Sequence, residues 1–145
     1  MDAPRHHGRM TPSRRPEWRT VVLDAQALSL WLDGDRRFLG RLAELAQDAT
    51  ALAVCTNTVI ELASHPAHRR LDWLLSRVRV EAVTVEVARL AGTLLRQAGL
   101  GGHRHAIDAS VAAVASRCDS PAAVMTSDPD DLYRLCQGRV DVLPV

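Results

Sequence analysis

The sequence predicts a single α/β domain built on a five-stranded parallel sheet with helices on both faces. Short apolar runs alternate with helical patterns from residue 20 to the end of the 145-residue chain. Such runs are typical of parallel strands, which are buried on both faces. Apolar residues make up 47% of the chain, enough for one core, and no internal repeat interrupts the pattern.

The strands are predicted from the uninterrupted apolar runs, each bounded by polar or turn-forming residues. In chain order they are 20–23, 50–55, 78–83, 122–126 and 139–143.

Helices are predicted between these runs, where apolar residues recur every three or four positions. Asp33 and Gly34 close the first helix, and Gly99 ends the fifth, after which residues 100–105 read as a loop. The second helix has a clear apolar face that includes Phe38 and Leu42. In chain order the helices are 25–32, 36–47, 58–64, 69–77, 85–97, 107–118 and 129–136.

We assign residues 20–145 as one domain. Residues 1–19 differ from this domain in composition. They are rich in arginine and show no hydrophobic period, so a flexible arm is expected. The arm either captures nucleic acid electrostatically or is an extension without a function.

Composition excludes several classes. No run of eighteen apolar residues is present, so neither a membrane span nor a membrane partner is expected. The first twenty residues lack the apolar stretch of a secretory signal, and a cytoplasmic protein is expected. Cys55, Cys118 and Cys136 form no CxxC pair and are expected to be buried free thiols. All eighteen basic residues are arginine, which excludes a P-loop with its lysine.

Four acidic residues are the candidate site: Asp24, Glu61, Asp108 and Asp128. Asp24 follows the first strand, Asp128 follows the fourth, and the other two lie early in predicted helices. The carboxyl ends of parallel strands and the helix starts after them share one edge, where such folds bind ligands. Two like charges about 4 Å apart cost roughly 4 kcal/mol at an effective dielectric of about 20. Carboxylates gathered there would hold protons or a divalent cation such as Mg²⁺ or Mn²⁺.

Each acid also has a structural interpretation. Asp24 is a good helix N-cap, and Asp128 followed by proline is a strong helix start. Glu61 stands three residues after Thr58, the spacing of a capping box. Asp108 would favour the dipole of a helix that begins at residue 107, although that helix is otherwise almost wholly apolar.

Other polar residues near these positions are assigned weaker roles. Asp131 is expected to be a first-turn acid of its helix, with an assisting role at the site as the alternative. The histidines are expected to be solvated loop residues, and both tryptophans at positions 31 and 73 are expected to pack in the core. Arginines or a histidine could instead line the mouth of the site and hold phosphates; the candidates are Arg69, Arg70, His103 and Arg104.

Taken together, these segments resemble the PIN domain, the nuclease fold of the VapC toxins of bacterial toxin–antitoxin modules. The resemblance covers roughly residues 20–145. It is carried by Val21-Val22-Leu23-Asp24-Ala25, Glu61, Ile107-Asp108-Ala109 and Thr126-Ser127-Asp128-Pro129-Asp130-Asp131-Leu132.

The resemblance implies a three-layer fold with strand order 3-2-1-4-5, which places Asp24 beside Asp128. It also implies that Asp24, Glu61, Asp108 and Asp128 hold one or two Mg²⁺ or Mn²⁺ ions and cut RNA phosphodiesters. The implied partners are an RNA substrate, a cognate antitoxin and a second copy of the chain in a homodimer. One departure is the stretch His105-Ala106-Ile107, where many PIN toxins carry a further polar or acidic residue.

We therefore expect a metal-dependent ribonuclease, and the alternative is a PIN-like module that binds RNA or a partner with little or no catalysis. A receiver domain is disfavoured because it needs a lysine after its last strand, and the chain has none. A haloacid-dehalogenase-like phosphatase is disfavoured because Asp24-Ala25-Gln26 lacks the required Asp-x-Asp.

Overall fold

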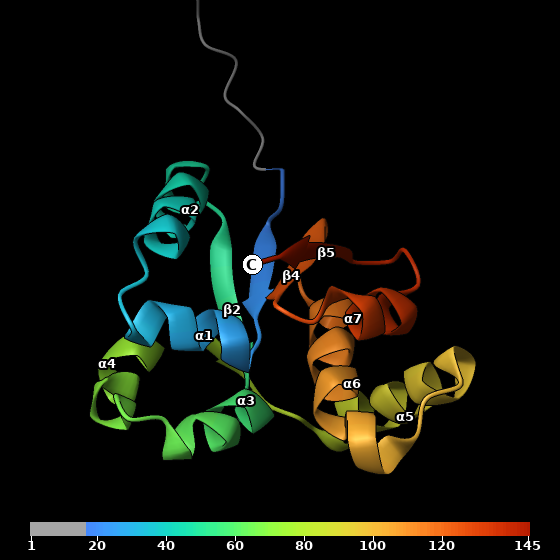
Figure 1. Ribbon diagram of the computed structural model, residues 1–145. Coiled ribbons are helices and arrows are strands. Elements are labelled where there is room, and N and C mark those ends of the chain that lie inside the picture. Colours follow the sequence, from blue (N-terminus) through green and yellow to red (C-terminus); the bar gives the residue numbers. More distant parts are fainter. Residues whose placement is uncertain (1–16) are drawn as a thin grey trace, which may run out of the picture.

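The structure, a computed structural model, describes residues 17–145 and contains one five-stranded sheet. All its strands are parallel, in the order β3-β2-β1-β4-β5 (Figure 1), which confirms the predicted topology. The strands are β1 (Thr20–Leu23), β2 (Ala51–Cys55), β3 (Arg79–Glu81), β4 (Ala122–Thr126) and β5 (Asp141–Pro144).

Most of the predicted arm, residues 1–16, lies outside the described residues. Where the described chain begins, Trp18 and Arg19 are tied to the sheet. The Trp18 indole donates to Asp141 Oδ2 at 2.8 Å, and the Arg19 amide donates to the Pro121 carbonyl at 2.8 Å.

Helices cover both faces of the sheet because successive strand side chains point in opposite directions. Val21 and Leu23 of β1 pack in one core and Val22 in the other. The first core lies against α1 (Ala25–Leu32), α2 (Arg36–Gln47) and α4 (Leu71–Leu75). The second lies against α5 (Val85–Ala98), α6 (Gly102–Arg117) and α7 (Pro129–Cys136).

The helix α6 lies directly against the sheet, as its small residues predict. Ala109, Ala112 and Ala113 are fully buried, which lets neighbouring backbones approach closely. However, α6 begins at Gly102, five residues before the predicted start, so the predicted loop over residues 100–105 is wrong beyond Gly101. Only three residues, 99–101, are needed to join α5 to α6, because Gly99 turns the chain in a left-handed conformation.

The segment after β2 also differs from the prediction. The helix α3 (Thr56–Glu61) begins two residues early and continues as a short 3-10 turn, Leu62–Ser64. A second 3-10 turn, His68–Arg70, precedes α4, so the predicted helix over residues 69–77 is shorter. Pro66 interrupts the chain between the two turns, which explains the break.

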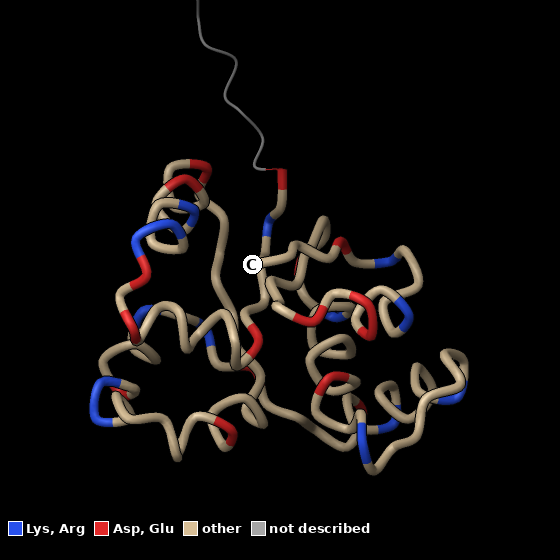
Figure 2. The backbone as a smooth tube through the Cα atoms, viewed as in Figure 1, with Lys and Arg blue, Asp and Glu red and all other residues tan. Residues whose placement is uncertain are grey.

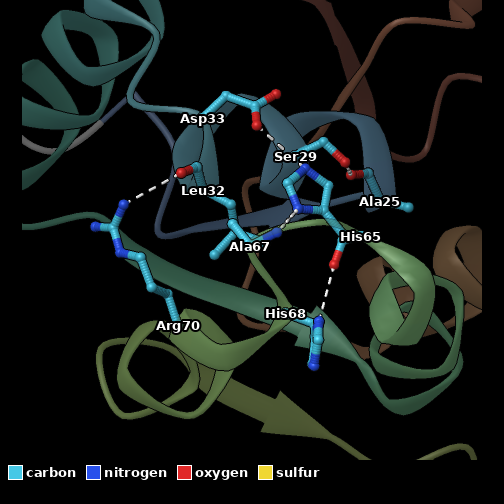
Figure 3. A network of polar contacts seen from close by, with 8 residues as sticks. All are labelled: Ala25, Ser29, Leu32, Asp33, His65, Ala67, His68 and Arg70. Atoms are coloured by element: carbon cyan, nitrogen blue, oxygen red, sulfur yellow. Dashed lines mark hydrogen bonds and ion pairs between the residues drawn. The ribbon is translucent and has the colours of Figure 1, made fainter.

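Polar contacts fasten this segment to the end of α1 (Figure 3). His65 Nε2 lies 3.2 Å from Asp33 Oδ1, while its Nδ1 accepts the Ala67 amide at 2.9 Å. The guanidinium of Arg70 donates to the Leu32 carbonyl at 3.2 Å. His65 is therefore a largely buried structural residue, and its assignment as a solvated loop residue is wrong.

Trp73 is also placed incorrectly by the sequence. Its side chain is 44% exposed, and the Arg70 and Arg77 guanidinium groups lie 5.3 and 5.2 Å from its ring. Trp31, in contrast, packs against the core as predicted.

The cysteines are free thiols, as expected: Cys55 and Cys136 are buried and Cys118 is half-buried. Over residues 17–145, no helix combines the length and apolar character needed to cross a bilayer.

Alanine substitutions at two glycines are expected to change stability in opposite directions. Gly99→Ala should lower the free energy of unfolding by about 1 kcal/mol, because Gly99 has φ +67° and a Cβ there is strained. Gly40→Ala should raise it by about 0.5–1 kcal/mol, because Gly40 lies inside α2 with open space around a new Cβ. Urea unfolding of both variants measures this. Two shifts of the same sign would contradict it.

Candidate acidic active site

Asp24 and Asp128 lie at the carboxyl ends of two neighbouring strands. Asp24 directly follows β1, and its amide donates to the Met125 carbonyl of β4 at 3.2 Å. Asp128 stands two residues after β4, where its amide donates to Thr126 Oγ1 at 3.0 Å. Chain connections leave β1 and β4 in opposite directions across the sheet, so this edge is a topological switch point.

Glu61 and Asp108 reach the same edge from two helices. Glu61 is the last residue of α3 and is exposed, whereas Asp108 lies in the second turn of α6 and is half-buried. A side-chain contact joins the helices close to both acids: Asn57 Nδ2 donates to Ser110 Oγ at 3.1 Å. Ser110 in turn donates to the Ile107 carbonyl at 2.7 Å, which fixes its hydroxyl. This bridge holds α3 against α6.

One pocket of about 220 Å³ brings the four acidic side chains together. Figure 2 shows acidic segments at the start of α1, at the end of α3, in α6 and at the start of α7. The pocket is lined by Asp24, Ala25, Gln26, Glu61, Asp108, Val111 and Asp128. No arginine lines this pocket. Any arginines or histidine that hold phosphates, as predicted for the mouth of the site, would therefore lie outside the pocket.

The structure confirms some of the purely structural roles expected for these acids and contradicts others. Asp24 is the N-cap of α1, and its Oδ1 accepts the Ala27 amide at 2.9 Å. Asp128 occupies the N-cap position of α7 with proline next, yet its side chain accepts no capping hydrogen bond. The capping box is wrong because Glu61 ends its helix instead of starting it. The dipole interpretation of Asp108 is wrong because α6 begins six residues earlier.

Burial, with the charges of neighbouring acids, raises the pKa of three of these carboxyl groups. Burial raises the pKa of Asp24 above its ordinary value, opposed by hydrogen bonds from Thr126 and from the Ala27 and Gln26 amides. Burial, together with the charges of Asp128, Asp24 and Asp131, raises the pKa of Asp108, while His105 lowers it. Partial burial and the charge of Asp108, then of Asp24, raise the pKa of Glu61. The negative charges of these carboxylates repel one another, and a bound cation would relieve this repulsion.

A divalent cation fits this donor set. Oxygen-only ligands are those that Mg²⁺ and Mn²⁺ prefer, and four carboxylates supply enough negative charge for one or two such ions. Asp24 is 8% exposed, and the hydrogen bond from the Ala27 amide fixes its carboxylate. It would therefore be a rigid metal ligand. The raised pKa values of Asp24 and Asp108 reflect burial and neighbouring negative charges, both of which a bound cation would offset.

Sequence reasoning placed His105 wrongly in a solvated loop and gave Asp131 an assisting role only as an alternative, and both lie beside the pocket. His105 lies on α6, not in a loop, and its Nδ1 is 3.4 Å from Asp131 Oδ2. With Asp108 these residues place three potential ligand atoms within 4.8 Å of one another. The His-x-x-Asp spacing puts His105 and Asp108 on one helix face, a pattern that is visible in the sequence only once the start of α6 is known.

The other candidates for the mouth of the site are less well placed. Arg70 is engaged with α1 and Trp73. His103 and Arg104 lie exposed in the first turn of α6, one turn before Asp108. Their proposed contact with phosphates stays a prediction.

A doubly wound parallel α/β domain with an acidic pocket at the switch point between β1 and β4 defines the class of this protein. A more specific assignment follows from comparison with known families: residues 21–137 match the PIN domain model, and the chain belongs to the PIN domain family. PIN domains are generally nucleases that use divalent metals.

Solved structures show the same fold at low sequence identity. The chain is similar to a chain of VapBC2 from Rickettsia felis bound to a promoter DNA fragment, with TM-score 0.65 and 17% identity over 87% of this chain and 98% of that one. It is also similar to a chain of FitAcB from Neisseria gonorrhoeae, with TM-score 0.63 and 20% identity over 85% and 96% of the two chains. FitAB bound to an IR36 DNA fragment gives TM-score 0.64 and 19% identity over 86% and 94%. No curated protein matches the chain in sequence.

Proposed function

We propose that this protein is a Mg²⁺- or Mn²⁺-dependent endoribonuclease that cuts RNA phosphodiesters at the acidic pocket. The observation that carries the proposal is that Asp24, Glu61, Asp108 and Asp128, from four different parts of the chain, line one pocket at the switch point. Membership of the PIN domain family supports the nuclease class.

The four acids would divide the work of holding the cation. Asp24 and Asp108 are the principal ligands, because a cap hydrogen bond orients the first and the rigid, buried helix α6 carries the second. Glu61 and Asp128 are more exposed and complete the set directly or through water. A bound divalent ion polarises a phosphate and lowers the pKa of a bound water. No covalent nucleophile from the chain is needed.

We further propose that the protein is the toxin of a toxin–antitoxin pair and forms a homodimer. Support comes from the fold shared with chains of VapBC2 and FitAB, both of which are bound to DNA fragments in their structures. A cognate antitoxin would mask the acidic pocket. RNA as substrate and an antitoxin as partner place this activity in the cytoplasm.

Incubation of the purified protein with structured RNAs tests the nuclease proposal. Wild type with Mg²⁺ or Mn²⁺ should cut RNA, and a chelator or Asp108→Asn should prevent cleavage. Equal cleavage by wild type and Asp108→Asn would remove the proposed site. RNA binding without cleavage would instead support the alternative of a binding module. A small DNA-binding protein encoded in the adjacent upstream reading frame would support the toxin assignment.

A further inference from the structure

An exposed tryptophan in contact with two arginines forms a surface patch that the acidic pocket does not use. The Trp73 side chain of α4 is 44% exposed, and the guanidinium groups of Arg70 and Arg77 lie 5.3 and 5.2 Å from its ring centroid. Arg69, next to Arg70 in the chain, is exposed as well. We call these four residues the tryptophan–arginine patch. Figure 2 shows basic stretches of chain around α4.

The arginines of the patch keep hydrogen-bond donors for a ligand. A guanidinium that stacks on an aromatic ring uses its face, so its N–H groups stay at the edge of the stack. One N–H of Arg70 donates to the Leu32 carbonyl, which fixes this side chain without using its other donors (Figure 3). Within residues 17–145, no ion pair joins a carboxylate to Arg69, Arg70 or Arg77, and the neighbouring Asp72 pairs with none of them. The patch therefore presents positive charge that no ion pair within the described chain neutralises.

The acidic pocket creates a need for such a surface. Four carboxylates line the pocket and no arginine does, so the pocket alone repels a polyanion. Cationic contacts elsewhere on the protein have to supply the attraction, because neutralisation of phosphates by basic side chains dominates nucleic-acid affinity. The chain runs from Glu61, which lines the pocket, through two 3-10 turns to the patch, and Figure 1 shows α3 between α4 and α6 in this view. An RNA strand that leaves the pocket on the α3 side would run toward the patch.

We propose that the tryptophan–arginine patch is a second contact for single-stranded RNA, outside the acidic pocket. The proposal deepens the proposed function and rests on it, because RNA is taken as the substrate. The arginines hold backbone phosphates, and an unpaired base stacks on the exposed indole or on a guanidinium plane. A single strand fits better than a duplex, because the bases of a duplex are already stacked on one another. The patch supplies affinity, and the pocket supplies the cleavage.

RNA binding in a chelator, where no metal-dependent cleavage occurs, tests the proposal by fluorescence anisotropy with a labelled oligouridylate and the full-length protein. Trp73→Ala should weaken binding at least about fivefold, the lower end of what loss of a base-stacking aromatic residue costs. Arg77→Gln should make the slope of log affinity against log salt shallower by about 0.7, as expected for one lost phosphate contact on a single strand. Trp73→Phe keeps an aromatic ring and should retain most of the affinity.

Arg89→Gln is the matched control, because Arg89 is exposed on α5, which covers the opposite face of the sheet from α4. It makes the same change in net charge as Arg77→Gln and should leave the affinity and the salt slope close to wild type. The same oligouridylate paired with oligoadenylate is a second control: Trp73→Ala should leave its affinity unchanged, because a duplex offers no unpaired base. Thermal melting checks the fold of each variant, and Arg77→Gln tests the patch if Trp73→Ala does not fold.

A cleavage assay separates failure of the patch from failure of the proposed function. With Mn²⁺, Trp73→Ala should raise KM while kcat at saturating RNA stays near wild type, as expected for a lost contact that does not touch the reacting atoms. If Trp73→Ala and Arg77→Gln bind RNA as Arg89→Gln does, the patch is overturned even when RNA is cut in an Asp108-dependent way. Binding that depends on the patch, without any cleavage, would support the patch while removing the nuclease assignment.

Discussion

Asp24→Asn is expected to reduce metal-dependent RNA cleavage by more than about 100-fold without unfolding the protein. Loss of an outer-shell partner alone commonly costs 10–100-fold in metal affinity or activity, by rough estimate, and Asp24 is proposed as a direct ligand. The amide oxygen of asparagine can still accept the Ala27 amide, so the cap of α1 is retained. Cleavage rates at saturating Mn²⁺ and a Mn²⁺ titration of both proteins measure the effect.

The chain supplies a closely matched control in Asp35→Asn. Asp35 caps α2 as Asp24 caps α1, with its Oδ1 accepting the Phe38 amide at 2.8 Å. It is exposed and lies outside the acidic pocket. Both substitutions therefore change an N-cap carboxylate to an amide, but only one removes a proposed ligand. Equal loss of cleavage in the two variants would show that capping, not metal binding, explains the effect at Asp24.

Much of the fold was predictable because its strands are buried on both faces. The apolar runs that became β1 and β4 have the predicted boundaries, since polar residues stop each run abruptly. Edge strand β3 is three residues shorter than predicted, because Val78, Ala82 and Val83 are apolar without being paired in the sheet. The start of α6 was missed because glycines at positions 101 and 102 favour a loop, whereas packing against α5 keeps the helix intact.

The site, like the fold, was predictable where the local sequence determines it and was not predictable where tertiary packing determines it. The four acids were identifiable because each stands next to a strand end or a helix in a recognisable order. Their assignment as metal ligands stays a prediction. Asp131 and His105 were undervalued because their proximity depends on how α6 packs against α7, which no local pattern encodes. Asp128 illustrates the reverse case: its motif predicted a side-chain cap, and the structure leaves the carboxylate free for the pocket.

Metal-free protein is expected to lose stability as the pH rises above the ordinary pKa values of the pocket's carboxyl groups. The pKa values of Asp24 and Asp108 lie above the ordinary 3.8, and that of Glu61 lies above 4.5. Over the window between ordinary and raised values, the folded state holds protons that the unfolded chain releases. The free energy of unfolding contributed by these groups therefore falls as the pH rises through that window, and the loss is complete above the raised values. Urea unfolding in a chelator across this range measures the slope.

Mn²⁺ should reverse this loss at neutral pH, because it replaces the released protons. At one hundred times the dissociation constant, binding adds about 2.7 kcal/mol, or roughly 5–10 °C in melting temperature for a domain of this size. In Asp24→Asn one ionisable carboxyl is gone, so both the pH slope and the Mn²⁺ shift should be smaller, whereas Asp35→Asn should match wild type. A full Mn²⁺ shift in Asp24→Asn would mean that the ion binds elsewhere, and the acidic pocket would then lose its assignment as the metal site even if RNA were cut. The paired measurement thus tests the site through stability alone, independently of any substrate.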